Sequence, residues 1–270
     1  MNEITSPAHK TSANIIDDAP RAAPLWRRVV SQTRYEALTM ARNGEQLLLL
    51  VILPVIALVA LSQSSILDGT LPDSANRVDY AVAGVLALSV ISNAFSGQGI
   101  QTGFDRRYGV LRQLSTTPLG RSGLIAGKFC AVLTVLVAQC AVIIMVGLAV
   151  GWKPPATAVA PAVIIMFLGA AAFTSLGLLV AGILRAEATL AVVNLLWVLL
   201  AAAGGTLAPT TVLPTWFAPI VSLLPSAALA DGLRHVLVTH SVGGLWGPAL
   251  ILVLWTAAAW AAAARWFRWN

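Results

Sequence analysis

Residues 157–184 read TAVAPAVIIMFLGAAAFTSLGLLVAGIL, a run without one charged side chain. About 20 mainly apolar residues are enough for an α-helix to cross a bilayer. The rest of the chain has the same character, with 58% hydrophobic residues, 10% charged residues and a mean hydropathy of +0.82. Soluble domains carry roughly 25% charged residues. The sequence therefore predicts an all-α integral membrane protein.

Five other apolar runs are similar to this one. The six predicted spans are residues 46–64, 79–103, 124–150, 157–184, 188–207 and 244–264. We assign them to one six-span transmembrane domain, residues 45–270. The first run follows a long polar leader and exceeds the apolar region of a signal peptide, so we expect it to stay in the mature protein.

Basic residues indicate the orientation, because short cytoplasmic loops hold an excess of Lys and Arg. With the N-terminus inside, the outer face keeps only Arg77, Lys153 and Arg234. The inner face then receives Lys10, Arg21, Arg27, Arg28, Arg34, Arg42, Arg106, Arg107, Arg112, Arg121, Lys128, Arg185, Arg265 and Arg268. We predict a multi-pass protein of the plasma membrane, the bacterial inner membrane, with both termini cytoplasmic. Anionic lipid explains the net charge of +6, and no nucleic-acid partner is required.

The leader divides into two parts. Residues 1–23 lack an apolar period and are predicted to be a disordered cytoplasmic tail. Residues 24–44 are predicted to form an interfacial amphipathic helix that contacts membrane lipid. Its apolar arc comprises Trp26, Val29, Val30, Thr33, Ala37, Met40 and Ala41. The polar side comprises Arg27, Arg28, Gln32, Arg34, Glu36 and Arg42, and Trp26 is expected at the headgroup level.

Several apparent chemical motifs fail on spacing. Gly123 stands three residues before Gly127, where a Walker A loop needs four, and Phe129 replaces its Ser or Thr. The glycines of residues 97–103 do not fit a dinucleotide loop. We predict that this chain is not an enzyme and binds no cofactor.

Sites for metal or for covalent chemistry are not predicted either. His235 and His240 lie on different sides of a helix, with no Cys or carboxylate cluster nearby, so no metal site is expected. Ser96 and His235 lack any hydrolase motif around them. Cys130 and Cys140 are too far apart along one helix to form a disulfide.

The spans hold almost no ionisable residue away from their ends, although ion and proton pathways normally retain some. A basic cytoplasmic segment, residues 104–121, lies between the second and third spans and reads FDRRYGVLRQLSTTPLGR. We call it the coupling segment and expect that a partner which supplies energy acts on the chain there. Neutral polar side chains follow one side of the second span, at Ser89, Ser92, Asn93 and Ser96. They form either a packing seam or a substrate-path wall.

Four prolines interrupt the chain between residues 209 and 225, which excludes one straight helix. We predict a re-entrant outer segment before the sixth span, and pairing of Asp231 with Arg234 on a helical face.

From about residue 24 onward, the chain resembles the type-2 ABC exporter permeases, the membrane subunits of daunorubicin-resistance-type drug exporters and of lipid and polysaccharide exporters. Residues 106–121 are similar to the segment between that family's second and third spans. Residues 213–216, Leu224-Pro225 and residues 232–234 are similar to its outer re-entrant segment. Many members carry Glu where Arg107 stands, so the polarity of the docking surface is expected to differ here.

This resemblance implies a cytoplasmic coupling helix that docks into a separate ABC ATP-binding subunit, which holds ATP and Mg²⁺. Two permeases, as a homodimer or a heterodimer, would pair with two ATPases. The implied coupling residues are Asp105, Arg106, Arg107, Tyr108, Leu111, Arg112 and Leu114. Leu111 and Leu114 would insert into the partner, and the three arginines would pair with its acids. The implied cargo is a drug, a lipid or a lipid-linked glycan, exported by alternating access.

Two other functions fit the residues. A gradient-driven secondary carrier would work without ATP, and its transport would be abolished by an uncoupler. A non-transporting membrane scaffold would bind partner proteins and show no transport after reconstitution.

Overall fold

The computed structural model describes residues 23–44, 48–63, 76–202, 204–206, 214, 216, 218–241 and 243–266. The tail at residues 1–22 and the proline-rich residues 207–213 lie outside this description. The described residues are helical and contain no strand. The α-helices are α1 (Leu25–Arg42), α3 (Leu53–Gln63), α4 (Arg77–Val90), α5 (Gln98–Arg107), α6 (Val110–Ser115), α7 (Gly120–Ala149), α8 (Ala156–Ile183), α9 (Ala186–Ala202), α10 (Ala218–Ser222), α11 (Pro225–Leu237) and α12 (Trp246–Trp266).

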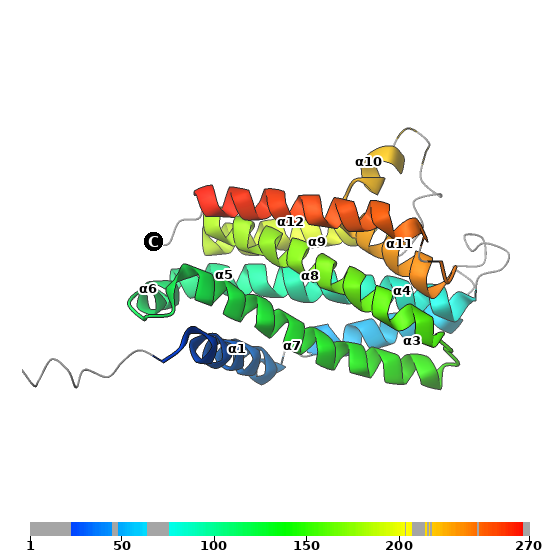
Figure 1. The fold of residues 1–270 in the computed structure, drawn as a ribbon, viewed down its shortest axis with the longest axis horizontal. Helices are drawn as coiled ribbons and strands as arrows, with labels where there is room; N and C mark the ends of the chain where they lie inside the picture. The colour runs from blue at the N-terminus through cyan, green and yellow to red at the C-terminus, as the bar shows by residue number, and fades with distance from the viewer. Residues whose placement is uncertain are drawn as a thin grey trace, which may run out of the picture.

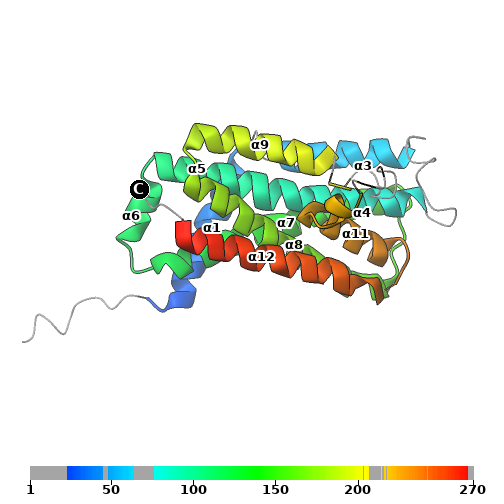
Figure 2. The ribbon, with the colours of Figure 1, turned by 90° about the horizontal axis from the view of Figure 1, so that it is seen from above.

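Two π-helical stretches extend these helices. Leu48–Ile52 leads into α3, and Ile91–Gly97 joins α4 to α5 in one continuous helix, Arg77–Arg107. This long helix, α7, α8 and α12 are long and apolar enough to cross a membrane. The helices in the regions of the first and fifth predicted spans are shorter, 10–17 residues within the described part of the chain. The long helices lie side by side along the molecule (Figures 1 and 2).

Helix α8 packs against α5, α11 and α12. The ring of Phe173 is buried there and meets Phe95 edge to face, with ring centroids 6.3 Å apart. The backbones of α8 and of the long helix approach closely at Gly177, where an added Cβ would lie 2.8 Å from the carbonyl oxygen of Phe95. Small residues at such crossings allow helices to pack tightly in membranes.

Helix α11 follows the proline-rich region and is buried against α4, α8 and α12. Every residue of this helix is buried except Asp231 and His235. The predicted pairing is confirmed, because the guanidinium of Arg234 lies 3.1 Å from Asp231. That guanidinium also lies 4.5 Å from the centroid of the Tyr80 ring and donates to the carbonyl oxygen of Thr206 at 2.9 Å. A re-entrant path within the membrane stays a prediction.

The basic elements gather at one end of the bundle, which we call the basic end. There α6 lies beside the end of α5, α1 packs along α7, and α12 ends at the same end of the bundle (Figures 1 and 2). The start of α7, the end of α8 and the start of α9 are at the same end. Arg77, which begins α4, and Lys153, which follows α7, belong to the opposite end. This grouping agrees with the charge asymmetry along the sequence.

Candidate functional site at the basic end

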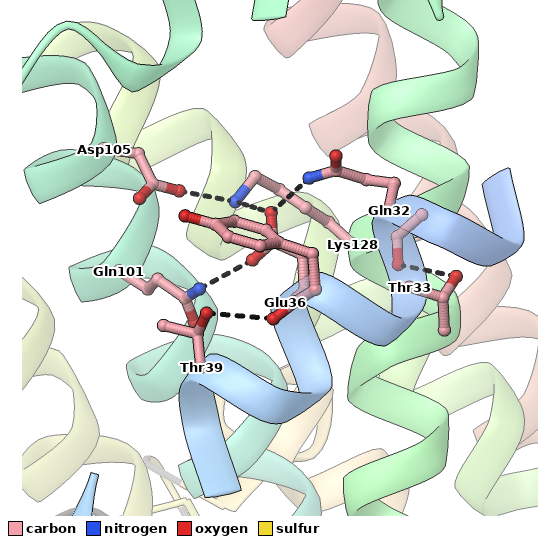
Figure 3. Close-up of polar contacts among 9 residues, drawn as sticks. Gln32, Thr33, Glu36, Thr39, Gln101, Asp105 and Lys128 are labelled. Atoms are coloured by element: carbon pink, nitrogen blue, oxygen red, sulfur yellow. Dashed lines mark hydrogen bonds and ion pairs between the residues drawn. The ribbon is translucent and has the colours of Figure 1, made fainter. Parts of the chain in front are cut away.

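A buried lysine holds three helices together at the basic end. The Lys128 ammonium, on α7, lies 2.8 Å from Glu36 Oε1 of α1 and 2.8 Å from Asp105 Oδ2 of α5 (Figure 3). The side chains of Lys128 and Glu36 are each 1% exposed, and that of Asp105 is 19% exposed. We call these three residues the charge cluster. It joins residues that are far apart in sequence.

Two glutamine amides complete the coordination of the Glu36 carboxylate. Gln32 Nε2 donates to Oε1 at 2.9 Å, and Gln101 Nε2 donates to Oε2 at 2.6 Å (Figure 3). A buried ion is costly unless it is paired and its remaining polar atoms are hydrogen-bonded. Both carboxylate oxygens of Glu36 are satisfied, so α1 is fixed against α5 and α7 through polar contacts as well as packing.

Helix α1 buries two of its polar residues against the bundle. Its buried stripe is Gln32, Glu36 and Met40, spaced four residues apart. Trp26 and Val30, from the predicted apolar arc, are 60% and 57% exposed. Gln32 and Glu36, which the sequence placed on the polar side of this helix, are therefore buried within the chain. An apolar pattern within one helix carries no information about a lysine that stands far along the chain.

The predicted interfacial residues lie at the outer side of α1. The guanidinium of Arg27 lies 5.2 Å from the centroid of the Trp26 ring, and Arg34 is exposed. Arg28 donates to the carbonyl oxygen of Pro118 in the coupling segment. Contact of this helix with lipid stays a prediction.

The coupling segment contains one short helix, α6, between two glycines with left-handed backbone. Gly109, with φ of 75°, lies between the end of α5 and the start of α6, and Gly120, with φ of 69°, is the first residue of α7. Glycine adopts this region without steric cost, whereas a side chain pays roughly 1–2 kcal/mol. These two turns set α6 apart from the long helices, across the basic end (Figure 2).

Leu111 faces into the chain. Its side chain is 1% exposed and packs with Leu119 and Leu124, against which Val29 and Leu114 also lie. The sequence interpretation placed Leu111 in the groove of a partner, and the structure instead uses it to seat α6 on α7 and α1. Leu114 is half-buried in the same contact.

The arginines of the segment differ in their surroundings. Arg106 donates to the carbonyl oxygen of Gly182 at 2.8 Å and to that of Leu184, so it satisfies the C-terminal end of α8. Arg107 pairs with Glu187 at the start of α9. Both arginines that were assigned to a partner's acids therefore have contacts within this chain.

The exposed part of the segment is smaller than predicted. Tyr108 is 72% exposed, and Arg112 is exposed on α6. The ring of Tyr108 stacks on Phe104, with centroids 6.1 Å apart, and this contact supports its outward position. Tyr108 and Arg112 are thus the predicted coupling residues that remain most accessible, together with the half-exposed side chain of Arg107.

The polar side chains of the second span point between helices. Ser89 and Asn93 are completely buried. The Asn93 amide donates to the carbonyl oxygen of Val132 on α7 at 3.3 Å, and Ser92 accepts from Trp197 Nε1 on α9 at 2.9 Å. Ser96 is half-buried in the same π-helical stretch. These bonds are those of a packing seam, and a substrate path along them stays a prediction.

Residues 25–238 match the sequence model of the ABC-2 type transporter family. The chain belongs to this family. No curated protein matches the chain with significance. The ABC-2 type transporter domain is the membrane component of an ABC transporter, so the chain is a multi-pass permease subunit. Its family also implies an ABC ATP-binding subunit as partner.

The sequence reading of this permease missed Glu36, Lys128 and the two glutamines as a unit. Lys128 was counted only as a cytoplasmic charge, although it lies within a predicted span. A lysine that is buried inside an apolar run needs a counter-ion, because a buried charge without a partner is costly. The i,i+4 spacing of Gln32 and Glu36 marked the candidate partner helix, but only the fold brings it to Lys128.

Proposed function

We propose that this ABC-2 permease exports a hydrophobic or amphipathic substrate, a drug, a lipid or a lipid-linked glycan, across the plasma membrane by alternating access. Its basic end and both termini lie in the cytoplasm. A separate ATP-binding subunit with Mg-ATP supplies the energy, and two permeases, identical or related, form the membrane part of the exporter.

The charge cluster is the observation that carries this proposal. Helix α6 sits on α1 and α7 through Leu111, and Lys128 ties α7 to both α1 and α5. A displacement of α6 by a partner is therefore passed to three helices at once. Such a link suits a subunit that has no nucleotide-binding motif of its own and is moved by a separate ATP-binding subunit.

The exposed side chains of the coupling segment define the docking surface that we propose for the ATP-binding subunit. Tyr108 and Arg112 project from the coupling segment, and the exposed half of Arg107 lies beside them. We assign binding of the ATP-binding subunit to these side chains, with Arg112 supplying a charge for an acidic group. Leu111 and Arg106 act from inside, because they hold the segment in place.

Co-purification of the full-length permease with its ATP-binding subunit tests this assignment. The double variant Tyr108→Ala with Arg112→Ala is expected to lose at least ~tenfold in the amount of bound ATPase, since exposed aromatic and Arg residues dominate interface energies. Lys153→Ala, at the opposite end, is the matched control and should retain the partner. The ATPase carries Walker A and Walker B motifs and is recognised by mass spectrometry.

Full retention of the ATPase by the double variant contradicts the docking surface. Transport that survives ATP depletion and stops with an uncoupler contradicts ATP-driven export and indicates a gradient-driven carrier. Bound partner proteins without any transport by the reconstituted complex indicate a scaffold.

A further inference from the structure

A cavity of about 240 Å³ lies at the basic end, next to α6 of the coupling segment. Helices α5, α7, α8 and α12 form its walls, and Leu111 of α6 closes one side. Its lining includes Thr102, Lys128, Ser175, Leu178, Trp260 and Ala263. Apart from the hydroxyl groups and Lys128, the lining is hydrocarbon and indole. It is separate from the polar seam on the second span.

The one cation in the wall is already paired. Lys128 is the one ionised side chain among the lining residues, and two carboxylates lie 2.8 Å from its ammonium on the side of α1 and α5. A ligand anion would face a cluster of one positive and two negative charges, and a ligand cation would find no acidic side chain in the lining. Either ion would lose its hydration without gaining an unpaired counter-ion in the wall, which is unfavourable. The cavity therefore favours a ligand group without charge.

One buried hydroxyl in the wall has no partner. Thr102 is 1% exposed, and its Oγ1 makes no hydrogen bond with any described residue. Ser175, on the facing helix, donates its hydroxyl to the carbonyl oxygen of Ala171 at 2.8 Å. Leaving a buried hydroxyl unpaired costs about 1–3 kcal/mol. A ligand oxygen that accepts from Thr102 would recover this loss.

We propose that the cavity binds an uncharged amphiphile from the inner leaflet, with a carbonyl or ether oxygen at Thr102 and an apolar body along Leu178 and Trp260. The proposal rests on the proposed export function and narrows its substrate to this class. Leu111 lines the cavity and also seats the coupling helix. A bound substrate thus touches the element through which the ATPase acts.

Three dyes with one ring scaffold test the charge of the ligand. Nile red is an uncharged phenoxazone with a ring carbonyl, Nile blue is its cationic analogue, and resorufin is an anion above neutral pH. Each is titrated into nanodiscs that contain the full-length permease, and the signal of empty nanodiscs is subtracted. We expect saturable fluorescence binding for Nile red and at least ~tenfold weaker binding for both ions.

Two substitutions locate the site. Thr102→Val keeps the shape and removes the donor, and it should weaken Nile red binding by roughly 2- to 12-fold. Ala263→Phe fills the cavity and should weaken it by at least ~tenfold. Ala261→Phe places the same ring on the exposed side of α12 and should bind like the unchanged protein. Unchanged binding by Ala263→Phe, or tighter binding of either ion, overturns the proposal.

ATP hydrolysis by the co-purified complex distinguishes a failure of the cavity as a substrate site from a failure of the proposed export function. Nile red should stimulate hydrolysis in the unchanged complex and in Ala261→Phe, and not in Ala263→Phe. Saturable binding without stimulation would overturn the role of the cavity as a substrate site. Failure to find an ATPase would overturn the proposed function, while the dye titration would still test the cavity.

Discussion

The Lys128 ammonium determines how the basic end is built. It is buried between the carboxylates of Glu36 and Asp105. Gln32 shares Glu36 Oε1 with Lys128, and Gln101 donates to the other oxygen, Oε2. Removal of one member of a buried ion pair usually costs about 3–5 kcal/mol, because the other charge stays buried without a partner. Glu36 would be affected most by the loss of Lys128. Only 1% of its side chain is exposed, so water cannot hydrate its charge in place.

Lys128→Met is therefore expected to lower the free energy of unfolding by about 3–5 kcal/mol. Lys153→Met changes the same residue type at an exposed position and should be nearly neutral. Adding Glu36→Gln to Lys128→Met removes the stranded carboxylate and should restore part of the loss. Thermal unfolding of the detergent-purified proteins measures all three. An unaltered melting temperature for Lys128→Met would mean that the cluster does not stabilise the fold.

The long helix Arg77–Arg107 and α8 approach each other closely because each has a glycine where they cross. Gly99 and Gly177 face each other at this crossing, and a Cβ on Gly99 would lie 3.4 Å from Gly177 Cα. The π-helical stretch Ile91–Gly97 lies just before this crossing and carries Ser92 and Asn93, which bond to α9 and α7. Such stretches are rare and frequently occur at functional sites. The crossing is thus both tight and polar.

Gly177→Ala should separate these helices by a few tenths of an ångström, because the new Cβ would meet the Phe95 carbonyl oxygen at 2.8 Å. We expect a loss of about 1–3 kcal/mol in stability. Gly247→Ala, on α12, meets nothing within 4 Å and serves as control. Guanidinium or heat unfolding in detergent compares the two variants. A Gly177→Ala protein as stable as the control would show that the crossing tolerates a wider spacing.

Helix positions could be read from the sequence, whereas contacts between helices could not. The runs at 79–103, 124–150 and 157–184 correspond closely to described helices, because length and apolar content alone determine a span. The burial of Glu36 on α1 was not predictable in this way, since its partner Lys128 lies far along the chain. Leu111 was misplaced for a similar reason, as Leu119 and Leu124 cover it.

The distribution of charge over the bundle gives it two distinct ends. Arg112 of α6 belongs to the basic end, and Lys153, between α7 and α8, belongs to the other. Cytoplasmic loops collect Lys and Arg, so the basic end is expected inside the cell. This orientation puts the coupling segment where a soluble ATPase can reach it.

Cysteine labelling in intact cells tests this orientation. In a background with Cys130→Ala and Cys140→Ala, Lys153→Cys should react with a membrane-impermeant maleimide added outside. Arg112→Cys should react only after the cells are opened. Labelling of Arg112→Cys from outside would reverse the topology and exclude the docking surface proposed above.

The order of the charge cluster along the chain has a consequence for biosynthesis. Glu36 leaves the ribosome first, Asp105 follows, and Lys128 comes last. When the hydrophobic segment that contains the lysine leaves the translocon, two carboxylates are already present at the membrane surface to receive its ammonium. Lys128 lies near the cytoplasmic end of its span, so its insertion penalty is smaller than that of a lysine at the helix centre, and helices made earlier supply the partners that reduce it further. Deletion of α1 is accordingly expected to impair integration of α7, before any transport could be measured.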